Sequence, residues 1–300
     1  MKRSKISIYA ALGANIAIAA VKFIAGGVTG SAAMIAEGVH SIVDSVNELL
    51  LLYGIYSSNK ERDQYHPFGY GRELYFWSFI VSILIFALGA GVSFYQGVAH
   101  LKQPAITGSL FWNYIVLIFS LLFEGISLII AFRQFRSANT EGSLLDAVIR
   151  SKDPASFMVL FEDGAAVTGL VLVLACLFIG DITHNPYFDG IASLLVGLIL
   201  TAASALLARE SRSLLIGEGI SAKTEKAIID LIKRDRSVVS TPRIFSLYQS
   251  PEEVLLVILL NFKPKLTVGE LNDHIDDIKR NIREQWPKIA YIVIQPEEGG

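Results

Sequence analysis

His40 and Asp44 are polar side chains within an otherwise apolar stretch near the start of the chain. Because they are four residues apart, they share one face of a helix, which Glu37, Asn47 and Glu48 extend into a polar stripe. Isoleucine and valine fill most of the remaining circumference. An imidazole and a carboxylate suit Zn²⁺, and Mn²⁺, Fe²⁺ and Co²⁺ also bind such sets. We therefore predict that His40 and Asp44 are metal ligands.

A second acidic pair, Glu162 and Asp163, lies in a later apolar run. Adjacent helical residues point about 100° apart, so at most one of the two aims directly at a given partner. Carboxylates among apolar neighbours need a counter-charge or a bound proton. A metal ion shared with His40 and Asp44 would supply that charge, so Asp163, with Glu162 as a further candidate, is predicted to complete the site. The alternative is a protonated carboxyl that only packs between helices.

Other polar residues carry weaker signals. Lys22 and Glu124, in two different apolar runs, are interpreted as a structural ion pair, with a role in transport as the alternative. Asp63 and His66 share a loop and supply only two ligands, so a solvated loop is the favoured interpretation and a second metal ion the alternative. The remaining histidines, expected to be ordinary surface residues, are His100, His184 and His274.

Six long apolar segments carry most of these residues. Of the 300 residues, 52% are hydrophobic and 18% charged, against about 25% charged in a typical soluble protein. A membrane-spanning helix needs about 20 mostly apolar residues. Six segments qualify: residues 6–27, 32–57, 74–100, 110–133, 155–180 and 187–208. They leave no polar faces for water, which argues against helices buried in a soluble protein. No small-residue cleavage site follows the first run, so it is interpreted as a retained helix.

Lysine and arginine are concentrated in alternate gaps between these segments, and the other gaps hold only Lys102. Basic loops stay on the cytoplasmic side, so both termini are predicted to be cytoplasmic, in what we expect to be a bacterial inner membrane. The net charge of −2 gives no basic surface for nucleic acid. A single cysteine, Cys176, excludes a disulfide framework.

Hydropathy falls after residue 208, which predicts a transmembrane domain of residues 1–208 and a small cytoplasmic domain of residues 209–300. Ser221 is a plausible N-cap, and Thr267 and Glu270 match a capping box. Periodicity predicts two helices, residues 221–235 and 267–285, and three strands, residues 243–249, 254–262 and 289–294. The order αββαβ gives a ferredoxin-like α+β sheet with helices on one face. About 90 residues support only a marginal core, so the domain is predicted to pair with a second copy.

Three other functions compete with metal transport. A proton-coupled carrier of a small organic substrate needs a larger polar cavity than the compact stripe offers. An intramembrane metallohydrolase needs a motif such as His-Glu-x-x-His, which the sequence lacks. A metal sensor would bind the ion without transporting it, and a measurement of ion flux would distinguish it from a transporter. Metal transport is the favoured interpretation.

The run Ser31–Ser45 resembles the second-span signature of cation diffusion facilitators, and His66-Pro-Phe-Gly-Tyr-Gly-Arg72 resembles that family's loop motif before the third span. With six spans and an αββαβ tail, the resemblance covers nearly the whole chain. Residues 66–78 and 160–163 most resemble the zinc transporter 9-like subgroup. The resemblance implies a homodimer that exports Zn²⁺ or a related divalent ion from the cytoplasm in exchange for protons. It implies no enzymatic activity and no resident cofactor.

The family pattern also implies a His-x-x-x-Asp pair on the fifth span. Asp163 matches the aspartate, but Val159 stands where the histidine is usual, and Glu162 is the predicted substitute. The departure weakens the implied selectivity for Zn²⁺.

Two further departures from the family pattern concern the loop before the third span and the C-terminal tail. Tyr70 stands where a loop histidine is common, so Asp63 and His66 match incompletely. The tail positions that often carry metal-binding histidines are Arg243, Leu259 and Ile294. The tail is therefore expected to be a dimerisation module without a binuclear metal site.

Overall fold

The computed structural model describes residues 2–29, 32–103, 110–138, 147–148, 151–240 and 242–297. The chain divides into two compact units. The helical unit comprises Met1–Lys60 and Glu73–Arg212, and the C-terminal unit comprises Ser213–Gly300 together with the loop Glu61–Arg72. By its contacts this loop belongs to the C-terminal unit, although it connects two helices of the other unit.

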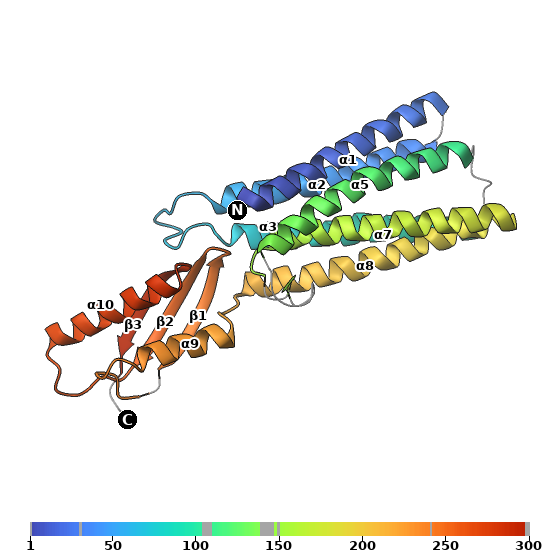
Figure 1. Cartoon of the computed structure of the whole chain (residues 1–300). Coiled ribbons are helices and arrows are strands. Elements are labelled where there is room, and N and C mark those ends of the chain that lie inside the picture. Colours follow the sequence, from blue (N-terminus) through green and yellow to red (C-terminus); the bar gives the residue numbers. More distant parts are fainter. Residues whose placement is uncertain are drawn as a thin grey trace. The chain divides into compact units, whose positions relative to one another are not determined.

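Helices fill all six ranges predicted to span a membrane (Figure 1). They are α1 (Lys2–Thr29), α2 (Ala32–Ser58), the continuous α3 (Glu73–Leu84), η1 (Ile85–Ala90) and α4 (Gly91–Lys102), α5 (Leu110–Ala138), α7 (Pro154–Thr183) and α8 (Tyr187–Ile216). Among the described residues, four segments are long and apolar enough to cross a membrane: Glu73–Lys102, Tyr114–Ser137, Pro154–Thr183 and Tyr187–Ile216. A shorter apolar helix, Ile8–Ile24, lies within α1. The predicted helical membrane fold is confirmed.

The helical unit packs through close contacts between helices. Helix α1 lies against α2 and α5, and α5 lies against α7. Glycines bring α4 and α8 together, because a Cβ added to Gly97 would lie 2.8 Å from the Leu194 side chain and one on Gly190 2.9 Å from that of Leu101. In lipid, where apolar burial alone does not drive association, such small residues let helices gain van der Waals contact.

The C-terminal unit has the predicted order of elements (Figure 1). They are α9 (Ala222–Ile232), β1 (Arg243–Ser250), β2 (Glu253–Leu260), α10 (Val268–Gln285) and β3 (Ile289–Pro296). Strand β2 is central, antiparallel to β1 and parallel to β3. The parallel pair needs a crossover connection, and α10 supplies it. The predicted αββαβ fold is confirmed.

One face of this sheet forms the core with both helices. Side chains of β2 alternate between buried and half-buried, and the buried set packs with α9, α10 and β3. The helix starts are fixed as predicted. The Ser221 hydroxyl accepts from the Thr224 N–H, and Thr267 and Glu270 form a capping box. Each cap satisfies backbone N–H groups that the first helical turn leaves open.

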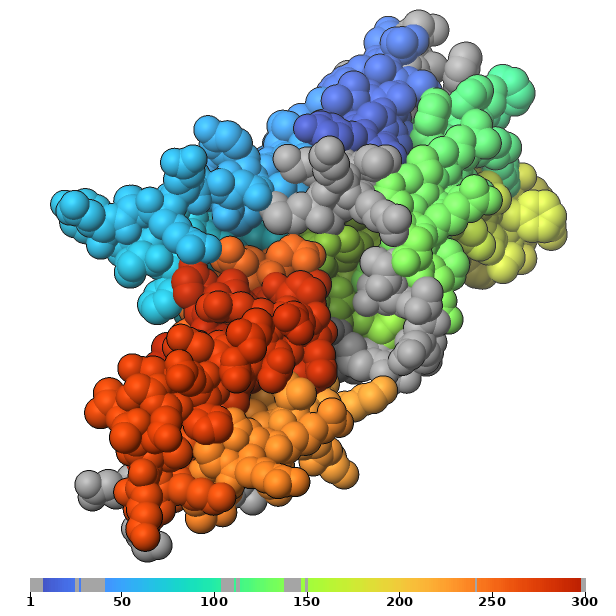
Figure 2. All heavy atoms as spheres, turned by 60° about the vertical axis from the view of Figure 1, so that its left-hand side comes forward, coloured from blue at the N-terminus to red at the C-terminus, as the bar shows by residue number. Residues whose placement is uncertain are grey.

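The loop Glu61–Arg72 packs on the sheet of the C-terminal unit. Arg62 Nη2 donates to Glu253 Oε1 at 2.9 Å, and its guanidinium carbon lies 4.9 Å from the Tyr291 ring centroid. The Phe68 ring meets Tyr291 edge-on, with centroids 5.2 Å apart. In the space-filling view the light-blue side chains of the loop lie directly against the red ones of the sheet (Figure 2). The loop is therefore more ordered than a solvated connection, although Asp63 and His66 remain exposed.

Candidate functional site

The predicted ligands come from α2 and α7. His40 lies on α2 by its backbone, but its side chain is outside the described part of the chain, so its role as a ligand stays a prediction. Asp44, one turn further along α2, is half-buried. On α7, Asp163 is only 2% exposed and Glu162 is half-buried. Val159, the position of the missing histidine, is buried one turn before Asp163.

Glu162 and Asp163 point to different helices. Asn47 of α2 donates through Nδ2 to Glu162 Oε1 at 3.0 Å. Ser127 of α5 donates through Oγ to Asp163 Oδ2 at 2.6 Å. Adjacent helical residues diverge by about 100°, and here the two carboxylates contact different helices, α2 and α5. Glu162 is thus the α7 acid with a hydrogen bond to α2.

A further acid, Glu48, belongs to the same polar region. It is 1% exposed, and Asn15 of α1 donates through Nδ2 to its Oε1 at 2.9 Å. The charges of Glu48, Asp44, Glu162 and Asp163 lie close enough to interact electrostatically. Like charges in a medium of low dielectric repel strongly, so this cluster is stabilised by any cation that enters it. The sequence placed Glu48 on the polar stripe without assigning it a role.

Asn15 and Ser127 are partners that the sequence analysis missed. Each is the hydrogen-bond donor to one buried acid, across 33 and 36 residues of sequence respectively. Ser127 follows Glu124 by three residues and therefore shares its helix face, which was an available signal. Asn15 is a lone amide in an apolar run, and nothing in the sequence connects it with Glu48.

Lys22 and Glu124 are both buried in the helical unit. Lys22 Nζ donates to Ser41 Oγ at 3.1 Å, and its charge also acts on Glu124. Glu124 in turn interacts electrostatically with Asp163 and Asp44. Glu124 therefore interacts both with Lys22, as in the structural ion pair, and with acids of the predicted site, as the alternative role in transport would require.

A ready-made metal site is not assembled by the side chains that the structure describes. Among them, no three His, Cys, Asp or Glu residues group closely enough to hold a metal ion. Asp44, Glu162 and Asp163 are thus neighbours without forming a coordination sphere by themselves. The predicted set requires His40, or inward rotation of these carboxylates around the ion.

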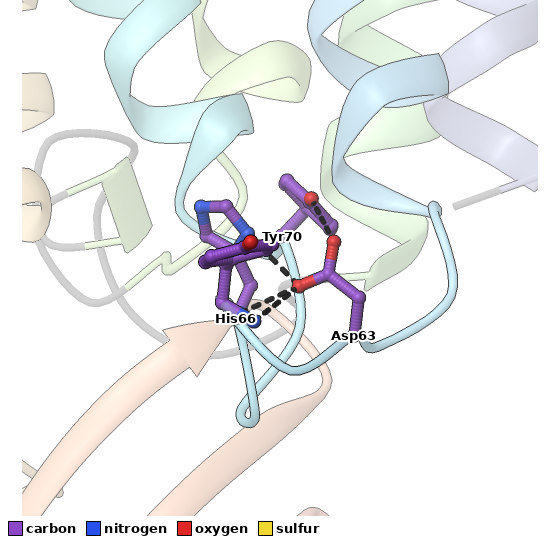
Figure 3. A network of polar contacts seen from close by, with 4 residues as sticks. Asp63, His66 and Tyr70 are labelled. Atoms are coloured by element: carbon purple, nitrogen blue, oxygen red, sulfur yellow. Dashed lines mark hydrogen bonds and ion pairs between the residues drawn. The ribbon is translucent and has the colours of Figure 1, made fainter.

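The loop residues Asp63 and His66 form a hydrogen-bonded network with Tyr70 (Figure 3). Asp63 Oδ1 accepts from the backbone N–H groups of Tyr65 and His66 and lies 3.2 Å from His66 Nδ1. The Tyr70 hydroxyl donates to Asp63 Oδ2 at 2.6 Å and, with the other hydrogen bonds, lowers the pKa of Asp63. Tyr70 therefore contacts this acid from the position where the family often has a histidine. These contacts account for both carboxylate oxygens without a metal ion.

The remaining histidines are expected to be ordinary surface residues, and two of them have acidic partners. His100 Nδ1 lies 2.6 Å from Asp189 Oδ2, and His274 Nδ1 lies 2.9 Å from Asp235 Oδ2. His184 ends α7 with a left-handed φ of 50°. These contacts give each residue a local structural role.

Comparison with known proteins places the helical unit in context. The profile of the Cation efflux transmembrane domain matches residues 8–216. The mitochondrial proton-coupled zinc antiporter SLC30A9 of Xenopus laevis is 39% identical over 212 residues, which is 70% of this chain and 38% of that protein. Metal tolerance protein C4 of Arabidopsis thaliana is 33% identical over 290 residues, 96% of this chain and 62% of that protein. The manganese efflux system protein MneP of Bacillus subtilis is 25% identical over 291 residues, 95% of this chain and 92% of that protein.

Proposed function

We propose, from the premise that the chain belongs to the cation efflux family of membrane transporters, that it exports a divalent metal ion from the cytoplasm in exchange for protons. Members of this family are transporters rather than enzymes. The observation that carries the proposal is the group of buried and half-buried, mutually interacting carboxylates on α2 and α7. Ionisable residues at membrane depth are costly to bury and mark transport paths.

The proposed ligands are His40, Asp44 and Asp163, with Glu162 taking the role that a histidine at position 159 would have. Ser127 holds Asp163, and the donors Asn47 and Ser127 leave one oxygen of each α7 acid available. Outer partners of this kind fix the orientation of a ligand and tune its affinity. The resulting set is one imidazole and up to three carboxylates.

Zn²⁺ is the first candidate for the cargo, and Mn²⁺ is the second. One protein similar to this chain is named a zinc antiporter, and another is named a manganese efflux protein. The specific observation in favour of Mn²⁺ is Val159, because its apolar side chain leaves a site richer in oxygen than in nitrogen. Carboxylate oxygens suit Mn²⁺, whereas imidazole suits Zn²⁺.

Proton exchange follows from the chemistry of these ligands. A metal ion binds neutral imidazole and ionised carboxylates, so it and the protons exclude each other from the site. If the emptied site faces outward, protons bind there and are carried in as it turns back. Two exclusive occupants and alternating exposure are sufficient for antiport. Export in this direction rests on cytoplasmic termini, which a reporter enzyme fused after residue 300 would test.

A homodimer is part of the proposal. The sheet face opposite the helices carries Phe245 and Val293, which are 60% and 50% exposed, and the half-buried Leu255 and Val257 between them. Pairing of two such faces would remove this apolar surface from water. Residues 209–300 expressed alone are expected to dimerise without metal. A tail that stays monomeric until Zn²⁺ is added would contradict this arrangement.

Flux in proteoliposomes tests the proposed transport. Vesicles that contain the full chain and a Zn²⁺ or Mn²⁺ indicator are given a proton gradient across the membrane. Metal is expected to move against the proton flow, and its apparent affinity is expected to fall as the pH drops from about 7.5 to about 6, near the reference pKa of histidine. Flux that neither moves protons nor responds to pH in this window would favour a uniporter. The surface variant Asp276→Ala serves as the matched control.

A further inference from the structure

Among the described residues of the helical unit, several buried oxygen atoms have no hydrogen-bond partner, and three of them belong to the acidic region of α2 and α7: Asn47 Oδ1, Glu48 Oε2 and Glu162 Oε2. Asn47 and Glu48 are 2% and 1% exposed, so water does not reach these side chains freely. A buried acceptor without a donor costs about 1–3 kcal/mol. Such atoms in a native fold call for a specific explanation, such as a ligand.

In each of these side chains one polar atom makes a hydrogen bond and the other, an oxygen, has no partner. Asn15 holds Glu48 by Oε1, and Asn47 holds Glu162 by Oε1. Asn47 itself donates its amide to Glu162 and leaves Oδ1 open. The charges of Glu48 and Glu162 interact, and Asp44 interacts with both. The arrangement therefore presents open acceptors, two of them on acidic side chains, in one electrostatic neighbourhood.

The chemistry of these atoms selects a cation as the missing partner. All three are oxygens, two from carboxyl groups and one from an amide, and such ligands suit hard divalent ions such as Mn²⁺. An anion would meet like charge, and a neutral apolar molecule would leave the acceptors unpaired. A cation would satisfy the acceptors and offset the repulsion between the two acids.

We propose that Asn47, Glu48 and Glu162 form a second cation station, one helical turn beyond Asp44 on α2. This inference rests on the proposed function, because it places a further binding step on the same path. Asn47 and Glu48 follow Asp44 by three and four residues, which is about 4.5–6 Å along a helix axis. Glu162 interacts with both stations and passes the ion between them. In the predicted orientation the C-terminal half of α2 is cytoplasmic, so this station captures the ion before it reaches Asp44.

Titration of the purified full-length protein with Mn²⁺, with free Mn²⁺ followed by its EPR signal, tests the second station. The wild type is expected to bind two ions per chain, and Glu48→Gln one. Glutamine keeps the size of the side chain and an oxygen for the Asn15 amide, so this variant retains the packing. Glu284→Gln makes the same exchange on the exposed surface of α10 and is expected to bind two ions. A Glu48→Gln protein with the stoichiometry and affinity of the wild type would overturn the inference.

Transport kinetics provide the second measurement. For a capture station, Glu48→Gln is expected to raise the KM for Mn²⁺ about 10-fold and to leave kcat within about twofold. An unchanged KM would also overturn the inference. Asp44→Ala separates the two proposals, because it is expected to abolish flux and still bind one Mn²⁺. Wild-type flux in Asp44→Ala would reject the proposed transport site, whatever the result for Glu48→Gln.

Discussion

Acidic residues of the loop Glu61–Arg72 and of the membrane helices differ in exposure and in the number of their hydrogen-bond partners. Asp63 is exposed, and protein donors or an imidazole nitrogen lie against both of its oxygens. Glu48 and Glu162 lie among helices, and each has one oxygen without a partner. A carboxylate whose partners are complete orders its own segment. A carboxylate that is buried with one oxygen unpaired destabilises the fold, and a bound cation would remove this cost.

The largest expected effect comes from removing an acid in the membrane. Asp44→Ala should reduce metal flux about 100-fold or more, because loss of a ligand exceeds the 10–100-fold effect typical of outer partners. His40→Ala should do the same. Both proteins should stay folded and keep the oligomeric state of the wild type, as size-exclusion chromatography would show. Metal flux into proteoliposomes measures the loss. Normal transport by Asp44→Ala would contradict the proposed role of the acids in the membrane helices.

Glu162 gives the next effect. Glu162→Gln should weaken metal binding about 10-fold, since it removes a charge and keeps an oxygen for the Asn47 amide. Val159→His in the same protein should restore part of the affinity by supplying the imidazole that the family pattern has. Calorimetric titration with Zn²⁺ and Mn²⁺ measures both variants. Unchanged affinity in Glu162→Gln would assign this residue to packing or to proton balance.

A smaller effect is expected where a positioning donor is lost. Ser127→Ala removes the hydroxyl that donates to Asp163 Oδ2 and leaves the carboxylate in place. Metal affinity should fall about threefold to 10-fold, at or below the lower end of the 10–100-fold range for outer partners. Ser127→Thr keeps a hydroxyl and should recover most of the affinity. A fall of equal size in the threonine variant would point to altered packing instead.

The ion pair of the loop should affect stability much less and metal binding not at all. Arg62 and Glu253 are partly exposed, and exposed pairs contribute about 0.2–1 kcal/mol after solvent screening. A double-mutant cycle with Arg62→Ala and Glu253→Ala, followed by thermal unfolding, measures this coupling. The number of bound metal ions should be the same in all four proteins. A changed stoichiometry would mean that the loop takes part in binding.

The smallest effect is the titration of Asp63. The Tyr70 hydroxyl and backbone N–H groups lower its pKa, so these hydrogen bonds stabilise the loop above the ordinary aspartate pKa. Their contribution to stability is lost as the pH falls through the lowered pKa of Asp63. Tyr70→Phe should move the pKa back up toward its usual range, which carboxyl NMR shifts would report. An unmoved titration would show that Tyr70 is not the main cause.

Local patterns in the sequence were sufficient for the elements. Apolar runs of spanning length predicted the helices, and the Ser221 cap and the Thr267–Glu270 capping box marked the starts of α9 and α10. The polar stripe of α2 and the acids of α7 were also visible, because their chemistry contrasts with that of their neighbours. These features depend on residues a few positions apart, which is the range over which helical periodicity and capping act.

Only the tertiary structure decided which polar groups meet and which oxygens stay open. The Asn47–Glu162 contact joins residues 115 positions apart, and the Arg62–Glu253 contact joins residues 191 positions apart. Packing of the loop against the sheet placed Glu61–Arg72 in the C-terminal unit, against the order of the chain. The sequence shows that Glu48 and Asn15 are polar, but their pairing follows from how α1 lies against α2. Side-chain partners across helices depend on packing geometry, and no local periodicity encodes it.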